Sequence, residues 1–249
     1  MELQIENEQA TWKHLVEGLP STMEETATAI RKTLETAGLL HLTWPMSMEH
    51  FDAIAGRLGK IVQRSDIKVD PERARNQERL RVIKGRPSVY RPGEIYFHTD
   101  PIADLVSWYC LVQDEIGGQM LMLDLGDLGD CFSAMDLETL SKVELWSPTR
   151  KSDNEQEKFI PVPVLSKTDG KYKIYYAPWL QQTSHDAGVD NVMEKFTAYL
   201  KKKEETQLIT LPVKPGDTVF LDNHRMLHGR GELTKSSKRH LVRLYIQAG

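Results

Sequence analysis

Short runs of β-prone residues, separated by turn residues, fill the centre and the C-terminal part of this 249-residue chain. The central runs lie between Leu80 and Ala177, and three more follow near the C-terminus, the last at 240–247. Runs of this length and spacing are typical of antiparallel sheets that pack face to face. The pattern therefore predicts an α+β, mainly β fold with a double-stranded β-helix, or jelly-roll, core.

Helical signals are fewer and lie mostly near the N-terminus. Residues 21–37 open with acidic residues and end before a glycine, and a short strand is expected at 39–42. Apolar residues at helical spacing predict a second helix at 47–58, and an apolar face predicts an inserted helix at 191–206. Residues 66–79 are charged and poor in apolar side chains, so we expect a long surface loop there.

The composition is that of an average globular protein, with 40% hydrophobic and 27% charged residues. We expect a single jelly-roll domain over 1–249, with an N-terminal elaboration at 1–65 and the catalytic core at 80–249. A domain of this size buries roughly 70–75% of the surface of its unfolded chain, so it needs no disulfide. Cys110 and Cys131 have no partner at metal-ligand spacing, which favours a reducing compartment.

The charge balance favours a small-molecule partner. The chain has 32 Lys and Arg against 36 Asp and Glu, a formal net charge of −4, which argues against nucleic-acid binding. The N-terminus is polar and acidic and does not resemble a signal peptide, and no apolar stretch of about 18 residues predicts a membrane span. We therefore expect a cytoplasmic protein, and the sequence carries no signal for its oligomeric state.

Two His-x-Asp tripeptides could supply metal ligands. His50 and Asp52 lie in an expected helix, where positions two apart project about 200° from each other and cannot share an ion. His98 and Asp100 instead end a strand run, where alternation places both side chains on one face. We therefore expect the second pair to bind a metal if a third ligand joins it.

A histidine-containing segment near the C-terminus offers that third ligand. Residues 214–230 combine a turn, a strand and two histidines, His224 and His228. Two imidazoles and one carboxylate form the facial triad of non-haem Fe(II) oxygenases, which leaves metal positions open for other ligands. The same three groups also occur in catalytic zinc sites, so a zinc hydrolase or lyase remains an alternative.

The motifs appear in a recognisable order: Phe97-His-Thr-Asp100, Gly117-Gly118, Pro215-Gly-Asp217, Asp222-Asn223, Leu227-His-Gly-Arg230 and Arg239-His-Leu. This order and spacing resemble the Fe(II)/2-oxoglutarate-dependent dioxygenases of the taurine dioxygenase and clavaminate synthase-like superfamily. The resemblance implies that His98, Asp100 and His228 are the iron ligands and catalytic centre. His224 is the competing third ligand, and we interpret it as a neighbour of the site.

The resemblance also implies roles for two arginines. Arg239 corresponds to the arginine that pairs with the distal carboxylate of 2-oxoglutarate, and Arg243 to a position that contacts an anionic substrate group. A planar guanidinium suits both tasks. The chain departs from the family pattern at Gln119-Met120, where a Thr or Ser that helps to hold 2-oxoglutarate is common.

By this resemblance, the expected reaction uses Fe(II), 2-oxoglutarate and O2 to hydroxylate an unactivated C–H bond, with release of succinate and CO2. Desaturation, cyclisation and epimerisation are alternatives on the same scaffold, and a non-catalytic binding protein is a further one. The cations ahead of the His98 strand favour a small amino-acid-like or anionic natural product as the substrate. These cations are Arg81, Lys84, Arg86 and Arg91.

Overall fold

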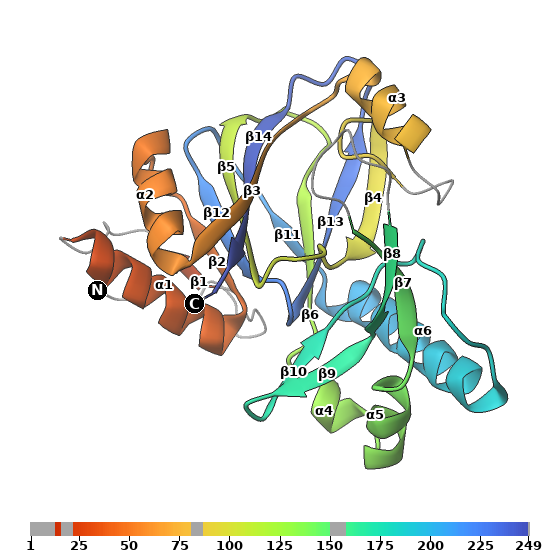
Figure 1. The fold of residues 1–249 in the computed structure, drawn as a ribbon. Coiled ribbons are helices and arrows are strands. Elements are labelled where there is room, and N and C mark those ends of the chain that lie inside the picture. Colours follow the sequence, from red (N-terminus) through yellow and green to blue (C-terminus); the bar gives the residue numbers. More distant parts are fainter. Residues whose placement is uncertain (1–12, 16–21, 81–86, 150–157, 249) are drawn as a thin grey trace.

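Two sheets, antiparallel except for the parallel pair of their first two strands, form the centre of the molecule (Figure 1). A computed structural model describes residues 13–15, 22–80, 87–149 and 158–248. The six-stranded sheet has the order β1 (Lys13–Leu15), β2 (Leu39–Leu42), β12 (Thr218–Asp222), β5 (Leu105–Val112), β14 (His240–Gln247) and β3 (Lys60–Lys68). The four-stranded sheet has the order β11 (Ile209–Leu211), β6 (Met120–Asp124), β13 (Met226–Leu233) and β4 (Gly93–His98). The expected mainly β, jelly-roll architecture is confirmed.

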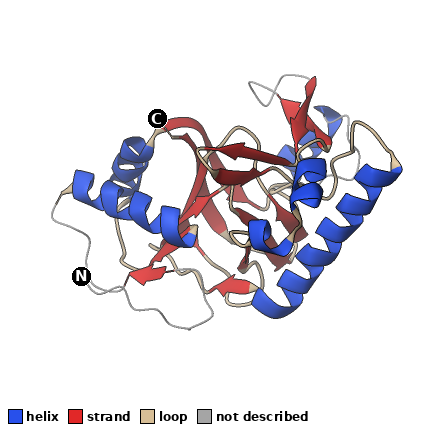
Figure 2. Cartoon of the chain, turned by 90° about the horizontal axis from the view of Figure 1, so that it is seen from below, coloured by secondary structure: helices blue, strands red, loops and turns tan. Residues whose placement is uncertain are grey.

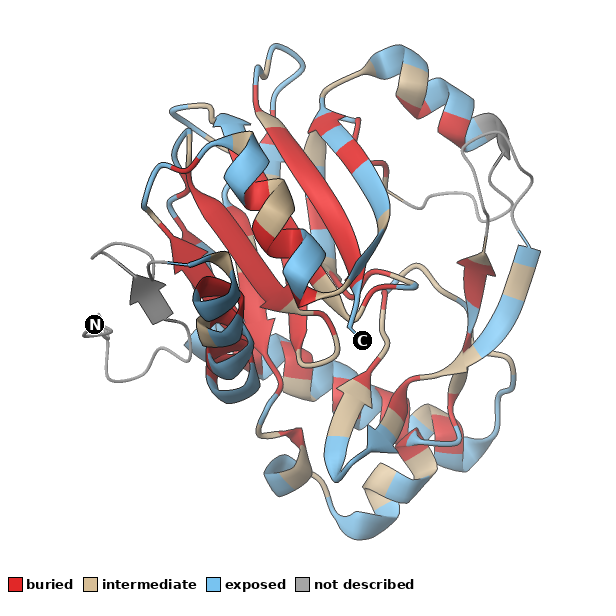
Figure 3. Cartoon of the chain, turned by 60° about the vertical axis from the view of Figure 1, so that its left-hand side comes forward, coloured by how far each residue is buried: buried red, intermediate tan, exposed pale blue. Residues whose placement is uncertain are grey.

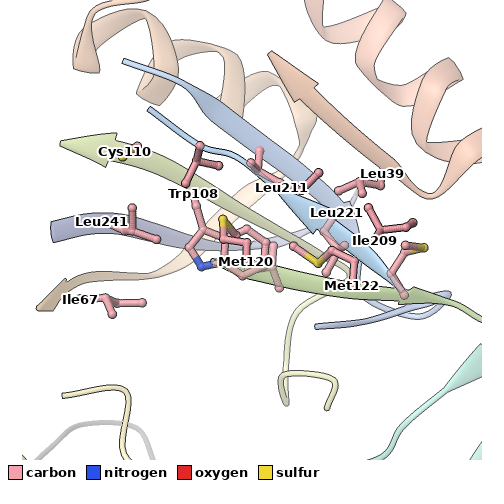
Figure 4. Close-up of a cluster of buried hydrophobic side chains, with 14 of the residues drawn as sticks. Leu39, Ile67, Trp108, Cys110, Met120, Met122, Ile209, Leu211, Leu221 and Leu241 are labelled. Carbon is pink, nitrogen blue, oxygen red and sulfur yellow. The ribbon is translucent and has the colours of Figure 1, made fainter. Parts of the chain in front are cut away.

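A layer of buried apolar side chains fills the space between the two sheets (Figure 4). The larger sheet contributes residues such as Leu39 and Trp108, and the smaller sheet contributes Met120 and Met122. Alternation along each strand directs these residues inward. Trp108 and Met120 also line a cavity that is described below.

Helices α1 (Met23–Ala37) and α2 (Met48–Leu58) cover the outer face of the larger sheet, where Figure 3 shows the buried residues of the strands behind them. Thr22 caps α1 through a reciprocal pair of hydrogen bonds with Glu25, and Ser47 caps α2. The two expected helices are confirmed. Strand β2, from the expected N-terminal elaboration, is an inner strand of the larger sheet.

A long insertion between β6 and β11 packs on the smaller sheet through a separate apolar cluster. Helix α6 (Ala187–Gln207) lies on the opposite side of the strands from α1 and α2 (Figure 2). The expected inserted helix is confirmed, and more elements accompany it: α4 (Leu128–Cys131), α5 (Ala134–Leu140), β7 (Glu144–Thr149), β8 (Lys158–Pro163), β9 (Leu165–Thr168) and β10 (Lys171–Ile174). None of the described helices combines the length and apolar character needed to span a bilayer.

The prediction of a long surface loop at 66–79 is wrong. Strand β3 continues to Lys68 along β14, and helix α3 occupies Pro71–Leu80. The helix begins there because Asp70 accepts a hydrogen bond from the backbone N–H of Arg73 at 3.0 Å, and a proline suits the first helical position. The sequence also predicts a strand that begins at Leu80. The residues that follow, 81–86, lie outside the described residues.

Candidate metal centre and its two cavities

His98 and His228 face each other across the β4–β13 pair. The strand register aligns the two residues directly, and their ring centroids lie 4.3 Å apart. Asp100 follows the end of β4 and approaches the same point, with Oδ1 3.8 Å from Nε2 of His98 and Oδ2 3.3 Å from Nε2 of His228. One candidate ligand atom from each residue lies within 4.8 Å of the others, and all three residues are buried. The structure thus brings together the three residues expected from the sequence.

Asn223, on the turn between β12 and β13, holds the loop that carries Asp100. Its side-chain oxygen accepts a hydrogen bond from the backbone N–H of Asp100 at 2.9 Å. Its amide group donates to the carbonyl oxygens of Asp100, at 2.8 Å, and Ala103, at 2.7 Å. Because β4 ends at His98, this loop and not strand alternation sets the position of the carboxylate.

The three side chains are poised to bind a cation. The ring Nδ1 of His98 lies 2.8 Å from the carbonyl oxygen of Tyr96, so a proton there leaves Nε2 with a lone pair directed at the cluster. Burial, together with His228, lowers the pKa of His98 to about 3, so the imidazole is neutral at physiological pH. Burial by itself raises the pKa of Asp100, but Arg243 and the two imidazoles outweigh it and hold this pKa well below its usual range.

His228 supplies a direct test of whether a metal fits. Both of its ring nitrogens are buried, and neither makes a hydrogen bond to a described residue. A buried imidazole without a partner is costly, whereas coordination of a cation would satisfy it. Two imidazoles and one carboxylate are also the donor set of the non-haem Fe(II) centres. The residues present therefore fit such a metal.

The competing histidine lies elsewhere. Nε2 of His224 lies 2.7 Å from Oδ1 of Asp104, away from the cluster, and its backbone N–H donates to Asp222. His50 and Asp52 lie on α2 and have separate partners, Ser47 and Arg64 respectively. Neither His224 nor His50 belongs to the group of described residues that could hold a metal. The sequence analysis did not select either of them as a ligand.

A small cavity of about 40 Å³ opens beside His228, and Arg239 lies on its wall. The side chain of Arg239 is buried and makes one hydrogen bond to a described residue, from Nε to Oε1 of Gln113 at 3.0 Å. Burial lowers the pKa of Arg239 to about 10, and the nearby Cys110 and Asp114 offset only part of this effect. A second buried guanidinium, that of Arg230, lines the same cavity.

Gly118 leaves room for Arg239. Its backbone φ is +66°, in the left-handed region, and a Cβ atom there would lie 2.8 Å from Cδ of Arg239. Gln119 is exposed, whereas Met120 is buried on the cavity wall. Gln119 therefore does not replace the hydroxyl donor that is absent from this position. Gln113 had no sequence signal, since it precedes Arg239 by 126 positions.

A larger cavity of about 120 Å³ lies on the other side of the metal ligands. Its wall combines aromatic residues, including Trp179 at 4.9 Å from the His98 ring, with neutral polar ones. Arg243 lines both cavities. Its Nη1 lies 3.2 Å from Oδ2 of Asp100. Its guanidinium carbon lies over the Tyr245 ring, 4.5 Å from the ring centroid. The two cavities thus meet at His98 and Arg243.

The cations ahead of β4 do not reach this cavity among the described residues. Arg91 forms an ion pair with Glu78 at the surface, and Arg81, Lys84 and Arg86 lie outside the described residues. Arg243 is the described cation that lines the larger cavity.

Comparisons with known proteins agree with this architecture. The structure is similar to a putative alpha-ketoglutarate-dependent taurine dioxygenase from Burkholderia xenovorans, at 11% identity and a TM-score of 0.71, over 100% of this chain and 93% of that chain. It is also similar to an asparagine oxygenase in complex with Fe(II), 2S,3S-3-hydroxyasparagine and succinate, at 15% identity and a TM-score of 0.68, over 91% and 79%. At these identities the likeness concerns the fold.

A third similar structure is AAD-2 in complex with Mn(II) and N-oxalylglycine, at 11% identity and a TM-score of 0.71, over 99% of this chain and 97% of that chain. No curated protein matches the sequence. The model of the taurine catabolism dioxygenase TauD, TfdA family, by contrast, matches residues 15–245. This match covers nearly the whole chain, which therefore belongs to the TauD, TfdA family of dioxygenases.

Proposed function

We propose that the protein is a non-haem Fe(II)- and 2-oxoglutarate-dependent oxygenase. It hydroxylates an unactivated C–H bond of a small anionic or amino-acid-like molecule, uses O2, and releases succinate and CO2. One observation carries the proposal: the buried cluster of His98, Asp100 and His228 adjoins a cavity in which Arg239 makes no hydrogen bond to a carboxylate of the described residues. A metal would bind to the cluster, and a carboxylate ligand would pair with Arg239.

His98, Asp100 and His228 would hold Fe(II), which supplies the redox chemistry that activates O2. The neutral His98 and the ionised Asp100 need not lose protons before they coordinate, so metal binding carries little proton cost. Asn223 keeps the carboxylate in place through its three hydrogen bonds to the loop. Such support usually matters for metal affinity.

Arg239 would bind the distal carboxylate of 2-oxoglutarate in the small cavity. A guanidinium can donate two parallel hydrogen bonds to a carboxylate. Oε1 of Gln113 accepts a hydrogen bond from Nε of Arg239, which fixes the orientation of the guanidinium. Trp108 and Met120 line the same cavity. Burial of the cavity strengthens these interactions, because little water competes for the donors.

Arg243 would bind the anionic group of the substrate in the larger cavity, close to the reacting centre. Trp179 and Ile95 close the cavity around the metal ligands and exclude water from it. The division of the site into two cavities thus separates co-substrate from substrate.

We place the reaction in the cytoplasm, as the sequence predicts. Cys110 and Cys131 are both free thiols, and Cys131 is exposed. An exposed free thiol is compatible with a reducing compartment, where ferrous iron and 2-oxoglutarate are also available.

The test is anaerobic addition of Fe(II) and 2-oxoglutarate to the purified protein. We expect a weak visible charge-transfer band from the metal complex of 2-oxoglutarate, lost in a His98→Ala/His228→Ala double variant. His185→Ala serves as a control, because His185 is exposed and pairs with Asp190. Absence of the band in the intact protein, or turnover without 2-oxoglutarate and O2, would contradict the proposal and favour a zinc hydrolase or lyase.

A further inference from the structure

The loop between β5 and β6 contacts Arg239 through the side chain of Gln113. Oε1 of Gln113 accepts a hydrogen bond from Nε of Arg239 at 3.0 Å. The amide NH2 group of Gln113 donates to carbonyl oxygens of its own loop, those of Gly117 at 3.1 Å and Asp114 at 3.3 Å. Both ends of the amide are therefore engaged, and the oxygen is the end that faces the guanidinium.

The same loop also holds the backbone next to Arg239. The carboxylate of Asp114 accepts hydrogen bonds from the hydroxyl group of Ser237 and, at 3.0 Å, from the backbone N–H of Lys238. The hydroxyl oxygen of Ser237 in turn accepts a hydrogen bond from the backbone N–H of Arg239 at 3.2 Å. The loop thus fixes this arginine both at its backbone and at its side-chain Nε.

Gln113 leaves the outer part of the guanidinium available. A guanidinium carries N–H donors on Nε, Nη1 and Nη2, so a carboxylate can bind end-on to the two Nη atoms when Nε is already engaged. Nη1 and Nη2 of Arg239 donate to no group of the described residues, and Arg239 lines the small cavity beside His228. The hydrogen bond at Nε therefore orients the side chain without occupying the donors that a carboxylate needs.

The neutral character of Gln113 matters as much as its position. Arg239 is 3% exposed, and burial lowers its pKa only to about 10, so the guanidinium remains charged at physiological pH. An amide oxygen replaces part of the lost hydration without cancelling this charge. A carboxylate there would form an ion pair with Arg239, as Asp124 does with Arg225, and a ligand carboxylate would then compete with it.

We propose that Gln113 is a positioning residue for 2-oxoglutarate, and that it acts through Arg239. Its amide oxygen holds the guanidinium at the small cavity, and its lack of charge keeps the arginine available for the distal carboxylate of the ligand. This role rests on the proposed function, in which Arg239 binds that carboxylate. The partner of this arginine must therefore accept a hydrogen bond and must also be neutral.

The test compares two 2-oxo acids that differ at one end. 2-Oxopentanoate has the chain of 2-oxoglutarate with a methyl group in place of the distal carboxylate, so it lacks the group that Arg239 would bind. Each acid is titrated into the anaerobic Fe(II) protein, and the charge-transfer band gives its dissociation constant without substrate or turnover. Denaturant unfolding of each variant without ligands measures stability separately.

Two substitutions of Gln113 separate orientation from charge. Gln113→Met removes the acceptor with little change of shape, and we expect about fivefold weaker binding of 2-oxoglutarate, in line with one neutral hydrogen bond. Gln113→Glu keeps an acceptor but adds a charge, and we expect about thirtyfold weaker binding, in line with a hydrogen bond to a charged group. Both variants lose the amide donors to the loop, so the difference between them reports the charge. Binding of 2-oxopentanoate should change by less than about twofold.

A purely structural role of Gln113 predicts the opposite order. The glutamate would still accept the hydrogen bond and would gain an ion pair, so Gln113→Glu would bind 2-oxoglutarate at least as tightly as Gln113→Met. That order overturns the inference. Equal losses for the two 2-oxo acids also overturn it, because the effect would then not depend on the distal carboxylate. Unchanged binding of 2-oxoglutarate in both variants overturns it as well.

The Arg239→Ala background tests whether Gln113 acts through the arginine. There we expect Gln113→Met to change the binding of 2-oxoglutarate by less than about twofold, and a further fivefold loss contradicts the inference. Gln207→Met and Gln207→Glu are the matched controls, because Gln207 is exposed on α6 and pairs with Lys203.

Ser237→Ala decides the question if the Gln113 variants do not fold. It removes the hydrogen bond that the backbone of Arg239 makes to the Ser237 hydroxyl group. We expect about threefold weaker binding of 2-oxoglutarate and unchanged binding of 2-oxopentanoate. Unchanged binding of both acids overturns the role of the loop.

Failure of this inference differs from failure of the proposed function. The band of the unmodified protein requires Fe(II) and 2-oxoglutarate alone. If this band forms and the Gln113 variants bind 2-oxoglutarate normally, only the role of Gln113 is wrong. If the band does not form in the unmodified protein, the oxygenase assignment itself is wrong.

Discussion

Two arginines at opposite ends of the β6–β13 pair have contrasting partners. Arg225 holds Asp124 with two hydrogen bonds, Nε to Oδ1 at 2.7 Å and Nη2 to Oδ2 at 2.6 Å. Arg239, near the other end, has a neutral amide partner. The hydrogen bond with Asp124 raises the pKa of Arg225, whereas burial lowers that of Arg239 to about 10. Among the described residues, the first charge has a carboxylate partner and the second has only a neutral amide.

The histidines show the same contrast. Nε2 of His41, which is fully buried in β2, lies 2.9 Å from Oδ2 of Asp217, and this carboxylate also accepts a hydrogen bond from the backbone of Lys214. His228 is equally enclosed but has no hydrogen bond to a described residue. Burial alone therefore does not distinguish the two histidines; the lack of a hydrogen bond to a described residue makes His228 the candidate metal ligand.

Removal of His228 should have the largest effect. We expect His228→Ala to abolish the rise in melting temperature that Mn(II) produces and to lower turnover by about a thousandfold or more, because a facial triad needs each of its ligands. His41→Ala is the matched change at the satisfied histidine, and it should lower stability while the Mn(II) response remains. An equal Mn(II) response in both variants would contradict the metal assignment.

Arg225→Ala should lower the free energy of unfolding by about 3 kcal/mol, because it leaves the buried Asp124 carboxylate unpaired. The concentration of 2-oxoglutarate needed for half-maximal turnover should not change. Denaturant unfolding and steady-state kinetics measure the two quantities. An Arg225→Ala/Asp124→Asn double variant should recover part of the stability, since it removes the stranded charge.

Arg239→Ala should show the reverse behaviour. We expect a 10- to 100-fold higher requirement for 2-oxoglutarate, which corresponds to about 1.5–3 kcal/mol for hydrogen bonds to a charged group. Stability without ligand should be nearly unchanged, because no carboxylate is left unpaired. A large loss of stability with an unchanged 2-oxoglutarate requirement would show that Arg239, like Arg225, stabilises the fold and does not bind 2-oxoglutarate.

Asn223 links the turn that carries Arg225 to the loop that carries Asp100, because its side chain makes hydrogen bonds to that loop. Asn223→Ala should weaken Mn(II) binding by about tenfold, because groups that orient ligands commonly matter to this extent. Asn191→Ala on the exposed surface of α6 is the control. Equilibrium dialysis gives the affinity directly, and unchanged affinity would limit Asn223 to a structural role.

Met120→Thr should have the smallest effect. It places a hydroxyl donor on the wall of the small cavity, and we expect the 2-oxoglutarate requirement to fall about threefold, in line with one net hydrogen bond. Met120→Val has nearly the same shape as the threonine variant without the hydroxyl group. Similar values for the two variants would show that no donor is needed at this position.

Local signals predicted the elements whose ends are defined locally. The glycine that ends α1, the serine that begins α2 and the short β-prone runs of β4, β5 and β14 were visible in the sequence. Helix α3 also had such a signal, Asp70-Pro71-Glu72, but its charged composition favoured a loop. Strand β3 had a weak signal because it is an edge strand with an exposed face, so its apolar pattern is incomplete.

The residues of the candidate site were named from motif order, but their geometry was not. His224 lies next to Asp104, which is 120 positions away in the sequence, and His228 lies in the candidate cluster. The place of Asp100 depends on Asn223, 123 positions later. Neither contact has a signal in local spacing.

The sequence by itself determined the mainly β architecture, the membership of a family and the identities of the candidate ligands. These depend on periodicity, caps and motif order, which are local properties of the chain. Only the tertiary structure decided which charges are paired. It gave Arg225 and Arg243 carboxylate partners and left Arg239 with a neutral amide partner on the wall of a cavity. The partner of a buried charge comes from distant strands, so packing alone determines whether that charge stabilises the fold or binds a ligand.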